Sequence, residues 1–326
     1  LKEKLGSHVK VCALGRGTDI QRKLRPDFDL VIEQQDILPE DIEMLSRELN
    51  LRETTSNTLA ALVQSFGEKK WFKTFMELKS GNGEGTLESW AQENRIIPQA
   101  AESLQGKLSR VFNKSYILEK APTNCIQQII ETLQSGCSVV LSFGKYESDL
   151  DYLLVTNILT RKIREVWEKR TNDFHGGTGK QPISLVIAIE EAHKLLNREM
   201  AGQTSFAMIA REMRKYFVTL LVIDQRPSQI YDEVMSQLGT RISGWLGDDA
   251  DISAVLSGLA GREALRGMLS RLQPKEEVLL LGYGVPMPLP VRSRRYDENF
   301  WKDLLGDQPI HSTMKDAKKD WMFPDE

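Results

Sequence analysis

Residues 184–193 read Ser-Leu-Val-Ile-Ala-Ile-Glu-Glu-Ala-His, a run of five apolar residues that ends in two acids. A short continuous apolar run is typical of a strand that a parallel sheet buries on both faces. Further runs that we interpret as strands occupy residues 9–14, 29–32, 139–143, 220–223, 242–246 and 278–281. Amphipathic helical patterns separate them, most clearly at residues 148–169. This alternation predicts an α/β fold with a mostly parallel sheet flanked by helices.

Residues 39–133 contain no convincing strand and are predicted to form a helical insertion. Their amphipathic segments are residues 39–49, 54–78, 86–93, 98–112 and 123–133. Glycines at residues 80–85 predict a loop tip, and residues 171–181 predict a second loop before the strand at residue 185. The expected organisation is therefore a core that starts at residues 1–38, the insertion at 39–133, the rest of the core at 134–296 and a tail at 297–326.

Bulk properties exclude several classes of protein. The chain has 326 residues and a net charge of −3, so overall charge does not indicate a polyanion binder. No apolar run reaches the roughly 18 residues of a membrane span, so we do not expect this chain to be a membrane protein. Three cysteines without a C-x-x-C spacing argue against a disulfide framework and a zinc site, and favour a cytoplasmic location. The chain begins at Leu1 without an export signal, and we interpret it as a fragment.

The two acids at the end of the strand, Glu190 and Glu191, are the main candidates for chemistry. In open α/β sheets ligands bind beyond the carboxyl ends of the strands. One carboxylate there can hold a water of a Mg²⁺ ion, and its neighbour can orient or deprotonate an attacking water. The alternative is a pair of acids that stabilises a helix amino terminus by about 0.3–1 kcal/mol. Spacing alone does not decide between these two interpretations.

The segment Glu190–His193 also contains Glu-x-x-His, a spacing found in di-iron carboxylate proteins. Such sites need the motif twice, and the other histidines, His8, His175 and His311, lack it. We therefore expect His193 to be a packed or hydrogen-bonded histidine.

Several motifs that follow in order make the chain similar to HerA-type ATPases of the FtsK and HerA group. The acids of residues 190–193 are followed by Arg-Glu-x-Arg-Lys at 211–215, Gln-Arg-Pro-Ser at 225–228 and Ser-Gln-Leu-Gly-Thr at 236–240. An acidic turn at 248–251 and a late strand at 278–282 complete the pattern. The resemblance covers residues 137–296 and, more loosely, the region before them. It implies a RecA-like core, ATP and Mg²⁺ as cofactors, and a homo-hexameric ring that moves along duplex DNA.

The resemblance also implies roles for single residues. Glu190 and Glu191 match the Walker B acids, with Glu190 on the water shell of Mg²⁺ and Glu191 as the catalytic glutamate. Gln225 matches a polar sensor of the terminal phosphate. Arg211 and Arg214 match a segment that presents an arginine finger to a neighbouring subunit, although a solvated helix face is the alternative. Further candidates are two arginines after the last strand, which could approach the phosphates or form a basic surface turn: Arg292 and Arg294.

Two features depart from the family pattern. Asp224 stands where a small hydroxyl residue is more usual, before Gln225. The phosphate-binding loop, G-x-x-x-x-G-K-[ST], is not found: residues 175–180 come nearest, but Gln181 follows Lys180 and the wrong strand comes next. Truncation before Leu1 explains this difference, since the family carries the loop upstream.

The function implied by the resemblance is an ATP-dependent DNA translocase or helicase. Such an enzyme would work with a NurA-like nuclease or another effector in DNA end processing or anti-phage defence. Basic residues on or near one helix could contact DNA phosphates, but a solvated helix face is the alternative; they are Arg161, Lys162, Arg164, Lys169 and Arg170. Two rival functions stay open: a conjugation or secretion ATPase, and a ring scaffold without a competent ATP site.

Overall fold

The computed structural model describes residues 2–15, 26–81 and 83–305. The chain separates into two compact units. The larger unit is Lys10–Asp224, and the smaller unit consists of the described parts of Leu1–Val9 and Gln225–Glu326. Each is described by itself.

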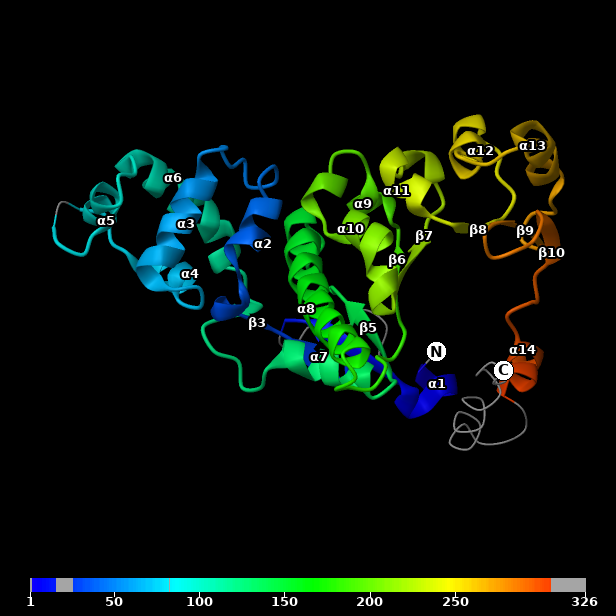
Figure 1. Ribbon diagram of the computed structural model, residues 1–326, viewed down its shortest axis with the longest axis horizontal. Coiled ribbons are helices and arrows are strands. Elements are labelled where there is room, and N and C mark those ends of the chain that lie inside the picture. Colours follow the sequence, from blue (N-terminus) through cyan, green and yellow to red (C-terminus); the bar gives the residue numbers. More distant parts are fainter. Residues whose placement is uncertain (1, 16–25, 82, 306–326) are drawn as a thin grey trace. The chain divides into compact units, whose positions relative to one another are not determined.

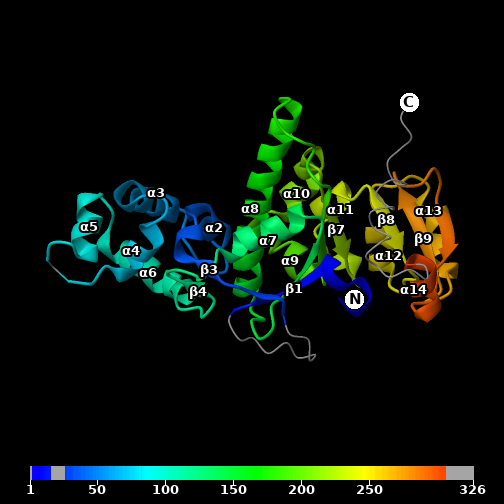
Figure 2. The ribbon, with the colours of Figure 1, turned by 90° about the horizontal axis from the view of Figure 1, so that it is seen from below.

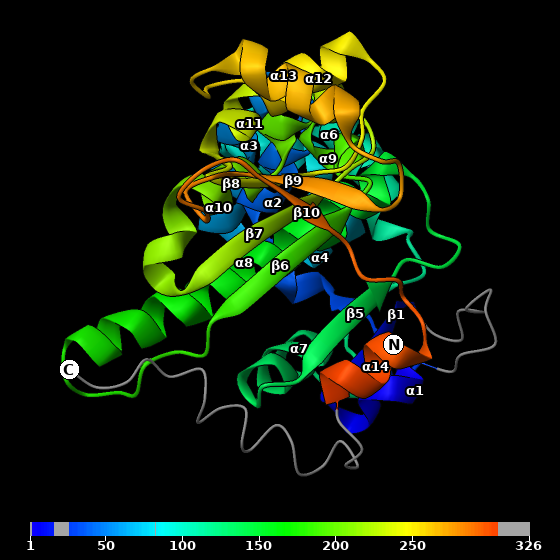
Figure 3. The ribbon, with the colours of Figure 1, turned by 90° about the vertical axis from the view of Figure 1, so that its right-hand side faces the viewer.

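The strands of the larger unit pair in three groups among the described residues. Strand β1 (Val9–Leu14) lies between β2 (Phe28–Leu30) and β5 (Ser138–Ser142), and it pairs with β2 in parallel. Short strands β3 (Ile32–Glu33) and β4 (Ile117–Leu118) form a parallel pair. Strands β6 (Leu185–Glu190) and β7 (Val218–Ile223) form the longest parallel pair and lie side by side in Figure 3. The α/β class predicted from the alternating pattern is thus confirmed.

Four helices lie close to these strands: α7 (Cys125–Gln134), α8 (Asp149–His175), α9 (His193–Leu196) and α10 (Phe206–Glu212). Helix α7 packs against β5, and α10 packs against β7. Ser148 caps α8 by accepting a hydrogen bond from the amide of Asp151. Helix α8 is the longest helix of the described chain, and Figure 2 shows it extending past α10 and β7.

The remaining helices of the larger unit form a cluster, seen together in Figure 1. They are α2 (Pro39–Met44), α3 (Thr55–Phe66), α4 (Trp71–Glu77), α5 (Leu87–Glu93) and α6 (Pro98–Phe112). Their shared core contains Trp71, Phe72 and Phe75, all buried, and Trp90 meets Phe75 edge to face. Gly67, with a φ of 78°, ends α3 and separates it from α4.

The smaller unit is built on an antiparallel sheet. Strand β9 (Glu277–Gly282) lies between β8 (Thr240–Ser243) and β10 (Leu289–Arg292). Its helices are α1 (Lys2–Leu5), α11 (Asp232–Gln237), α12 (Asp249–Val255), α13 (Arg262–Arg271) and α14 (Glu298–Leu305). Leu279 and Leu281 of β9 pack with apolar residues of α12 and α13 to form its core. None of the helices in the described part of the chain is long and apolar enough to cross a lipid bilayer.

Several details differ from the sequence prediction. The strand predicted at residues 29–32 is two short strands, β2 and β3, and the one predicted at 242–246 lies at 240–243. Strand β4 was not predicted, and residues 54–78 form two helices rather than one segment. Helix α8 continues to His175, so residues 171–175 are helical instead of part of a loop. Strands β8, β9 and β10 pair in antiparallel fashion, whereas a mostly parallel sheet was expected.

Burial of β6 and β7 also differs from expectation. Side chains of β6 and β7 alternate between a covered and an exposed face. Val186 is 57% exposed, and Leu221 and Ile223 are exposed as well. The apolar run predicted burial on both faces, but the described residues cover only one. A run of apolar residues indicates that both faces of a strand are apolar, but it does not identify the element that packs on each face.

Candidate functional site

The end of the β6–β7 pair positions the two acids. The parallel register continues to the last residue of each strand, where Glu190 lies opposite Ile223. One step further, the amide of Ala192 donates to the carbonyl oxygen of Ile223 over 3.3 Å. Because this pairing holds the chain beyond the strand, Glu190 and Glu191 are fixed at the carboxyl edge of the sheet, where ligands of such folds bind.

Both acids face solvent rather than a closed core. Glu190 is exposed, and the side chain of Glu191 is 48% exposed. Glu191 has a φ of 50°, in the left-handed region that non-glycine residues adopt at a cost of roughly 1–2 kcal/mol. Strained backbone of this kind clusters at functional sites, and here it lies at the end of β6.

His193 and Asp224 lie directly beside Glu191. Asp224 Oδ2 accepts a hydrogen bond from the backbone amide of His193 over 2.8 Å and lies 2.8 Å from its ring Nδ1. The Asp224 side chain is only 2% exposed, whereas Nδ1 of His193 also lies 3.7 Å from Glu191 Oε2. Asp224, which stands where a small hydroxyl residue is more usual, thus contacts both the backbone and the ring of His193 through one carboxylate oxygen. The sequence predicted a packed or hydrogen-bonded His193 without identifying its partner, which is Asp224.

Metal coordination by protein groups alone finds no support at this edge. The described residues contain no group of three or more His, Cys, Asp or Glu side chains that could hold a metal ion. Mg²⁺ usually keeps several waters and binds through one or two carboxylates together with substrate phosphates. The exposed acids Glu190 and Glu191 could supply the one or two carboxylates that such an ion needs. Glu190 would hold a water of the ion.

The arginines proposed as a finger lie before β7. Arg211 is in the last turn of α10 and Arg214 is in the 3₁₀ turn Met213–Tyr216, and both are exposed. Phe217, with a φ of 62°, then turns the chain into β7. Gln225 is exposed and follows Asp224, as the first residue of the smaller unit.

The two arginines after β9 occupy surface ion pairs. Arg292, the last residue of β10, pairs with Glu276, and Arg294 Nη1 lies 3.1 Å from Asp303 Oδ2. Exposed pairs of this kind contribute about 0–1 kcal/mol, so they hold these side chains only weakly.

Three basic residues of α8 form ion pairs within the protein. Arg161 pairs with the buried Asp41, and Lys162 pairs with Glu165 over 3.0 Å. Arg164 Nε lies 3.6 Å from Glu168 in the next turn. Arg161 was a candidate DNA contact, but the structure pairs it with Asp41 and leaves its side chain only 12% exposed.

Comparison with known proteins then places the chain. Residues 3–163 match the family model described as "Helicase HerA, central domain". The DNA double-strand break repair helicase HerA of Sulfurisphaera tokodaii is 25% identical over 268 residues, which cover 77% of this chain and 53% of the relative. The chain is therefore similar to HerA-type helicases. The HerA helicase of Sulfolobus acidocaldarius is 26% identical over 202 residues, covering 58% of this chain and 40% of the relative.

The HerA-type chain thus spans about half the length of the curated relatives it matches. The family resemblance drawn from the motifs is confirmed, although the matched family range is residues 3–163 rather than residues 137–296. That range ends before Glu190, so the residue roles at the strand end stay predictions. The solved structure of VirB4 from Thermoanaerobacter pseudethanolicus aligns with 90% of this chain and 83% of its own, at 15% identity and a TM-score of 0.49.

Proposed function

We propose that this HerA-type chain is part of an ATP-driven DNA translocase. The subunits form a homo-hexameric ring, bind ATP with Mg²⁺ at their interfaces and move along duplex DNA. A NurA-like nuclease or another effector acts with the ring in DNA end processing or anti-phage defence. The match to the HerA central-domain model and the names of the HerA relatives, which are DNA double-strand break repair helicases, support this function.

The observation that carries the proposal is the position of Glu191 at the exposed carboxyl edge of β6 and β7. In the proposed reaction Glu190 holds a water of the Mg²⁺ ion, and Glu191 orients the water that attacks the terminal phosphate. Gln225 senses that phosphate. Arg292 and Arg294 are further candidates for phosphate contact, because their surface ion pairs are weak enough to exchange for a more highly charged partner.

The test is the substitution Glu191→Gln in the full-length protein. Glutamine keeps the size of the side chain but cannot accept a proton from water, so ATP turnover should fall by at least 100-fold while ATP binding stays intact. Glu131→Gln is the matched control, because Glu131 is an exposed glutamate of α7 that accepts a hydrogen bond from Gln127. Turnover of the Glu191→Gln protein equal to that of the control would remove Glu191 from the catalytic site.

A mixing experiment tests the arrangement of the subunits. Arg211 and Arg214 are proposed to reach the nucleotide of a neighbouring subunit, so a protein with both arginines replaced by alanine should be inactive alone. Mixed with Glu191→Gln subunits, it should regain part of the activity, because some interfaces then contain an intact glutamate and an intact arginine. No recovery at any mixing ratio would contradict action between subunits.

A ring scaffold is the second candidate, and it rests on one sequence observation. The pattern G-x-x-x-x-G-K-[ST] does not occur in the 326 residues. Direct ATP binding by the full-length protein separates the two functions, since a scaffold without a competent site binds no nucleotide at concentrations where the motor is saturated.

A further inference from the structure

One histidine nitrogen lies between two carboxylates at the end of β6. Nδ1 of His193 is 2.8 Å from Asp224 Oδ2 and 3.7 Å from Glu191 Oε2. The shorter separation is a hydrogen bond, and the longer one is beyond hydrogen-bond range. The Nδ1 edge of the ring therefore binds Asp224 and forms a polar surface beside the Glu191 carboxylate.

Asp224 fixes this ring at two points. A carboxylate can only accept, so the hydrogen of the bond to Nδ1 lies on the imidazole. The same oxygen, Oδ2, accepts the backbone amide of His193, which opens α9. Because the Asp224 side chain is 2% exposed, few waters compete for these bonds. Both the ring and the backbone of His193 are therefore anchored to the end of β7.

The anchored ring restricts Glu191. Glu191 is two residues before His193, and its left-handed backbone directs the chain into α9. The Glu191 carboxylate is half exposed, and the polar edge of the His193 ring lies on one side of it. A general base acts well only when its position relative to the attacked atom is held.

We propose that His193 and Asp224 are positioning residues for the catalytic glutamate of this protein: Asp224 holds the imidazole, and the imidazole limits where Glu191 can point. This inference rests on the proposed function. It deepens that function, because His193 and Asp224 would hold Glu191 in position for water activation. Asp224 stands where a hydroxyl residue is usual in the family pattern.

The experiment compares His193→Ala with His193→Asn in the full-length protein, with kcat and KM for ATP hydrolysis measured for each. His193 is only partly buried, so both proteins should fold. Removing the ring should lower kcat roughly 10- to 100-fold and change KM for ATP less than about threefold, because Glu191 is misplaced while nucleotide contacts remain. Asparagine keeps an N–H donor near the position of Nδ1 and should recover most of kcat.

A double substitution tests whether Asp224 acts through the ring. Asp224→Ser alone should lower kcat, but in the His193→Ala background it should cause little further loss, because the two residues work as one unit. Tyr116→Phe is the control, since it removes a buried hydrogen bond to Asp151 elsewhere in the same unit and should leave kcat unchanged. If Asp224→Ser does not fold, the comparison of the two His193 substitutions decides alone.

The possible results separate this inference from the proposed function. If the wild-type protein hydrolyses ATP and Glu191→Gln abolishes turnover, but His193→Ala retains the wild-type kcat, the positioning role is wrong and the motor stands. Equal loss in the alanine and asparagine proteins also overturns it, since a purely structural role predicts no rescue. If the wild-type protein does not hydrolyse ATP, or Glu191→Gln leaves turnover unchanged, both proposals are wrong.

Discussion

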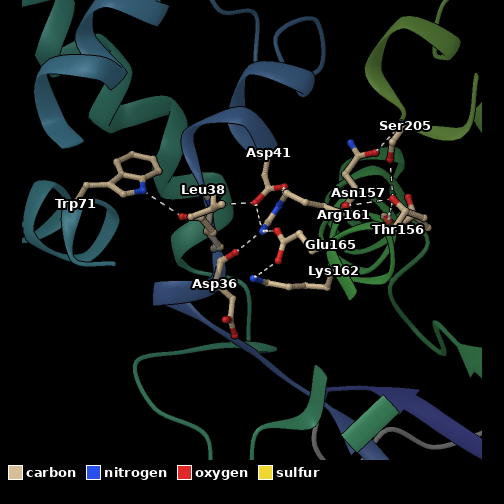
Figure 4. A network of polar contacts seen from close by, with 12 residues as sticks. Asp36, Leu38, Asp41, Trp71, Thr156, Asn157, Arg161, Lys162, Glu165 and Ser205 are labelled. Atoms are coloured by element: carbon tan, nitrogen blue, oxygen red, sulfur yellow. Dashed lines mark hydrogen bonds and ion pairs between the residues drawn. The ribbon is translucent and has the colours of Figure 1, made fainter. Parts of the chain in front are cut away.

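Arg161 of α8 and Asp41 of α2 form an ion pair through two hydrogen bonds, although they lie 120 residues apart in the sequence. Arg161 also donates to the carbonyl oxygen of Asp36 and to Glu165, as Figure 4 shows. Asp41 is 1% and Arg161 12% exposed. Asp41 also accepts the amide of Leu38 at the start of α2, so one carboxylate both caps α2 and ties it to α8.

Breaking this pair should strongly destabilise the larger unit. Asp41→Ala or Arg161→Ala leaves one buried charge without its partner, and the free energy of unfolding should fall by about 3–5 kcal/mol. The double substitution Asp41→Leu with Arg161→Met should cost less than either single change, because no charge remains unpaired. Urea unfolding of the three proteins measures this, and additive losses would contradict the explanation.

Asp151 provides a pH-dependent test of stability. Burial raises its pKa, but hydrogen bonds from Lys114, Ser148 and Tyr116 outweigh this effect, so the pKa of Asp151 is lowered in the folded protein. A lowered folded pKa adds stability that is present above the unfolded value, about 3.9, and is lost as the pH falls through the folded value.

Asp151→Asn should therefore destabilise the protein most near pH 7, where Asp151 is ionised. The difference in unfolding free energy between the two proteins should shrink as the pH falls below the unfolded value, about 3.9, because the unfolded carboxyl then binds a proton more readily than the folded one. Denaturation curves at pH 7, 5 and 3 test this. A difference that stays constant over this range would show that the ionised form of Asp151 gains nothing from its partners.

Arg241 is a buried cation whose hydrogen-bond partners are carbonyl oxygens. Its guanidinium donates to Met235, Val255 and Ser257, near the carboxyl ends of α11 and α12. Helix carboxyl ends carry unpaired carbonyls and partial negative charge, which a buried guanidinium satisfies. Burial lowers the pKa of Arg241.

Arg241→Met should lower the stability of the smaller unit by about 3 kcal/mol, because it leaves buried carbonyls without donors. Arg241→Lys should recover only part of the loss, since an ammonium group cannot reproduce the planar arrangement of donors. Amide hydrogen exchange in α11 and α12 reports this locally. Full recovery by lysine would mean that charge matters here more than geometry.

The sequence predicted the elements whose signal is local. The run at residues 185–189 predicted β6, and the apolar repeat of residues 148–169 predicted most of α8. The two-residue strand β4 has no such signal, because only its pairing with β3 defines it. The strand predicted at residues 242–246 forms at residues 240–243 for a related reason. Pairing with β9, and not the apolar content of the segment, sets where β8 begins and ends.

Side-chain partners far apart in the sequence could not be predicted. Arg161 lies in a cluster of charges on α8 that is typical of a solvated face, and only the fold brings Asp41 to it. Asp224 was recognised as unusual for the family, but the sequence gives no reason to pair it with His193, 31 residues earlier. The acids Glu190 and Glu191 were found because their signal, two carboxylates after an apolar strand, is contiguous.

The backbone of Glu191 leads to a prediction that reverses the usual order of two residues. In ordinary helix or strand positions alanine is more stable than glycine by roughly 0.5–1 kcal/mol. At a φ of 50° a side chain costs roughly 1–2 kcal/mol, and glycine avoids that cost.

Glu191→Gly should therefore be more stable to chemical denaturation than Glu191→Ala by about 1 kcal/mol, while both lack ATP turnover. The matched control is Glu131, which lies within α7, where alanine should be the more stable of the two substitutions. If the alanine protein is the more stable one at both positions, Glu191 is not strained in solution. The reversed order would show that the chain keeps a glutamate at a position where glycine is more stable, as expected when the carboxylate is needed for function.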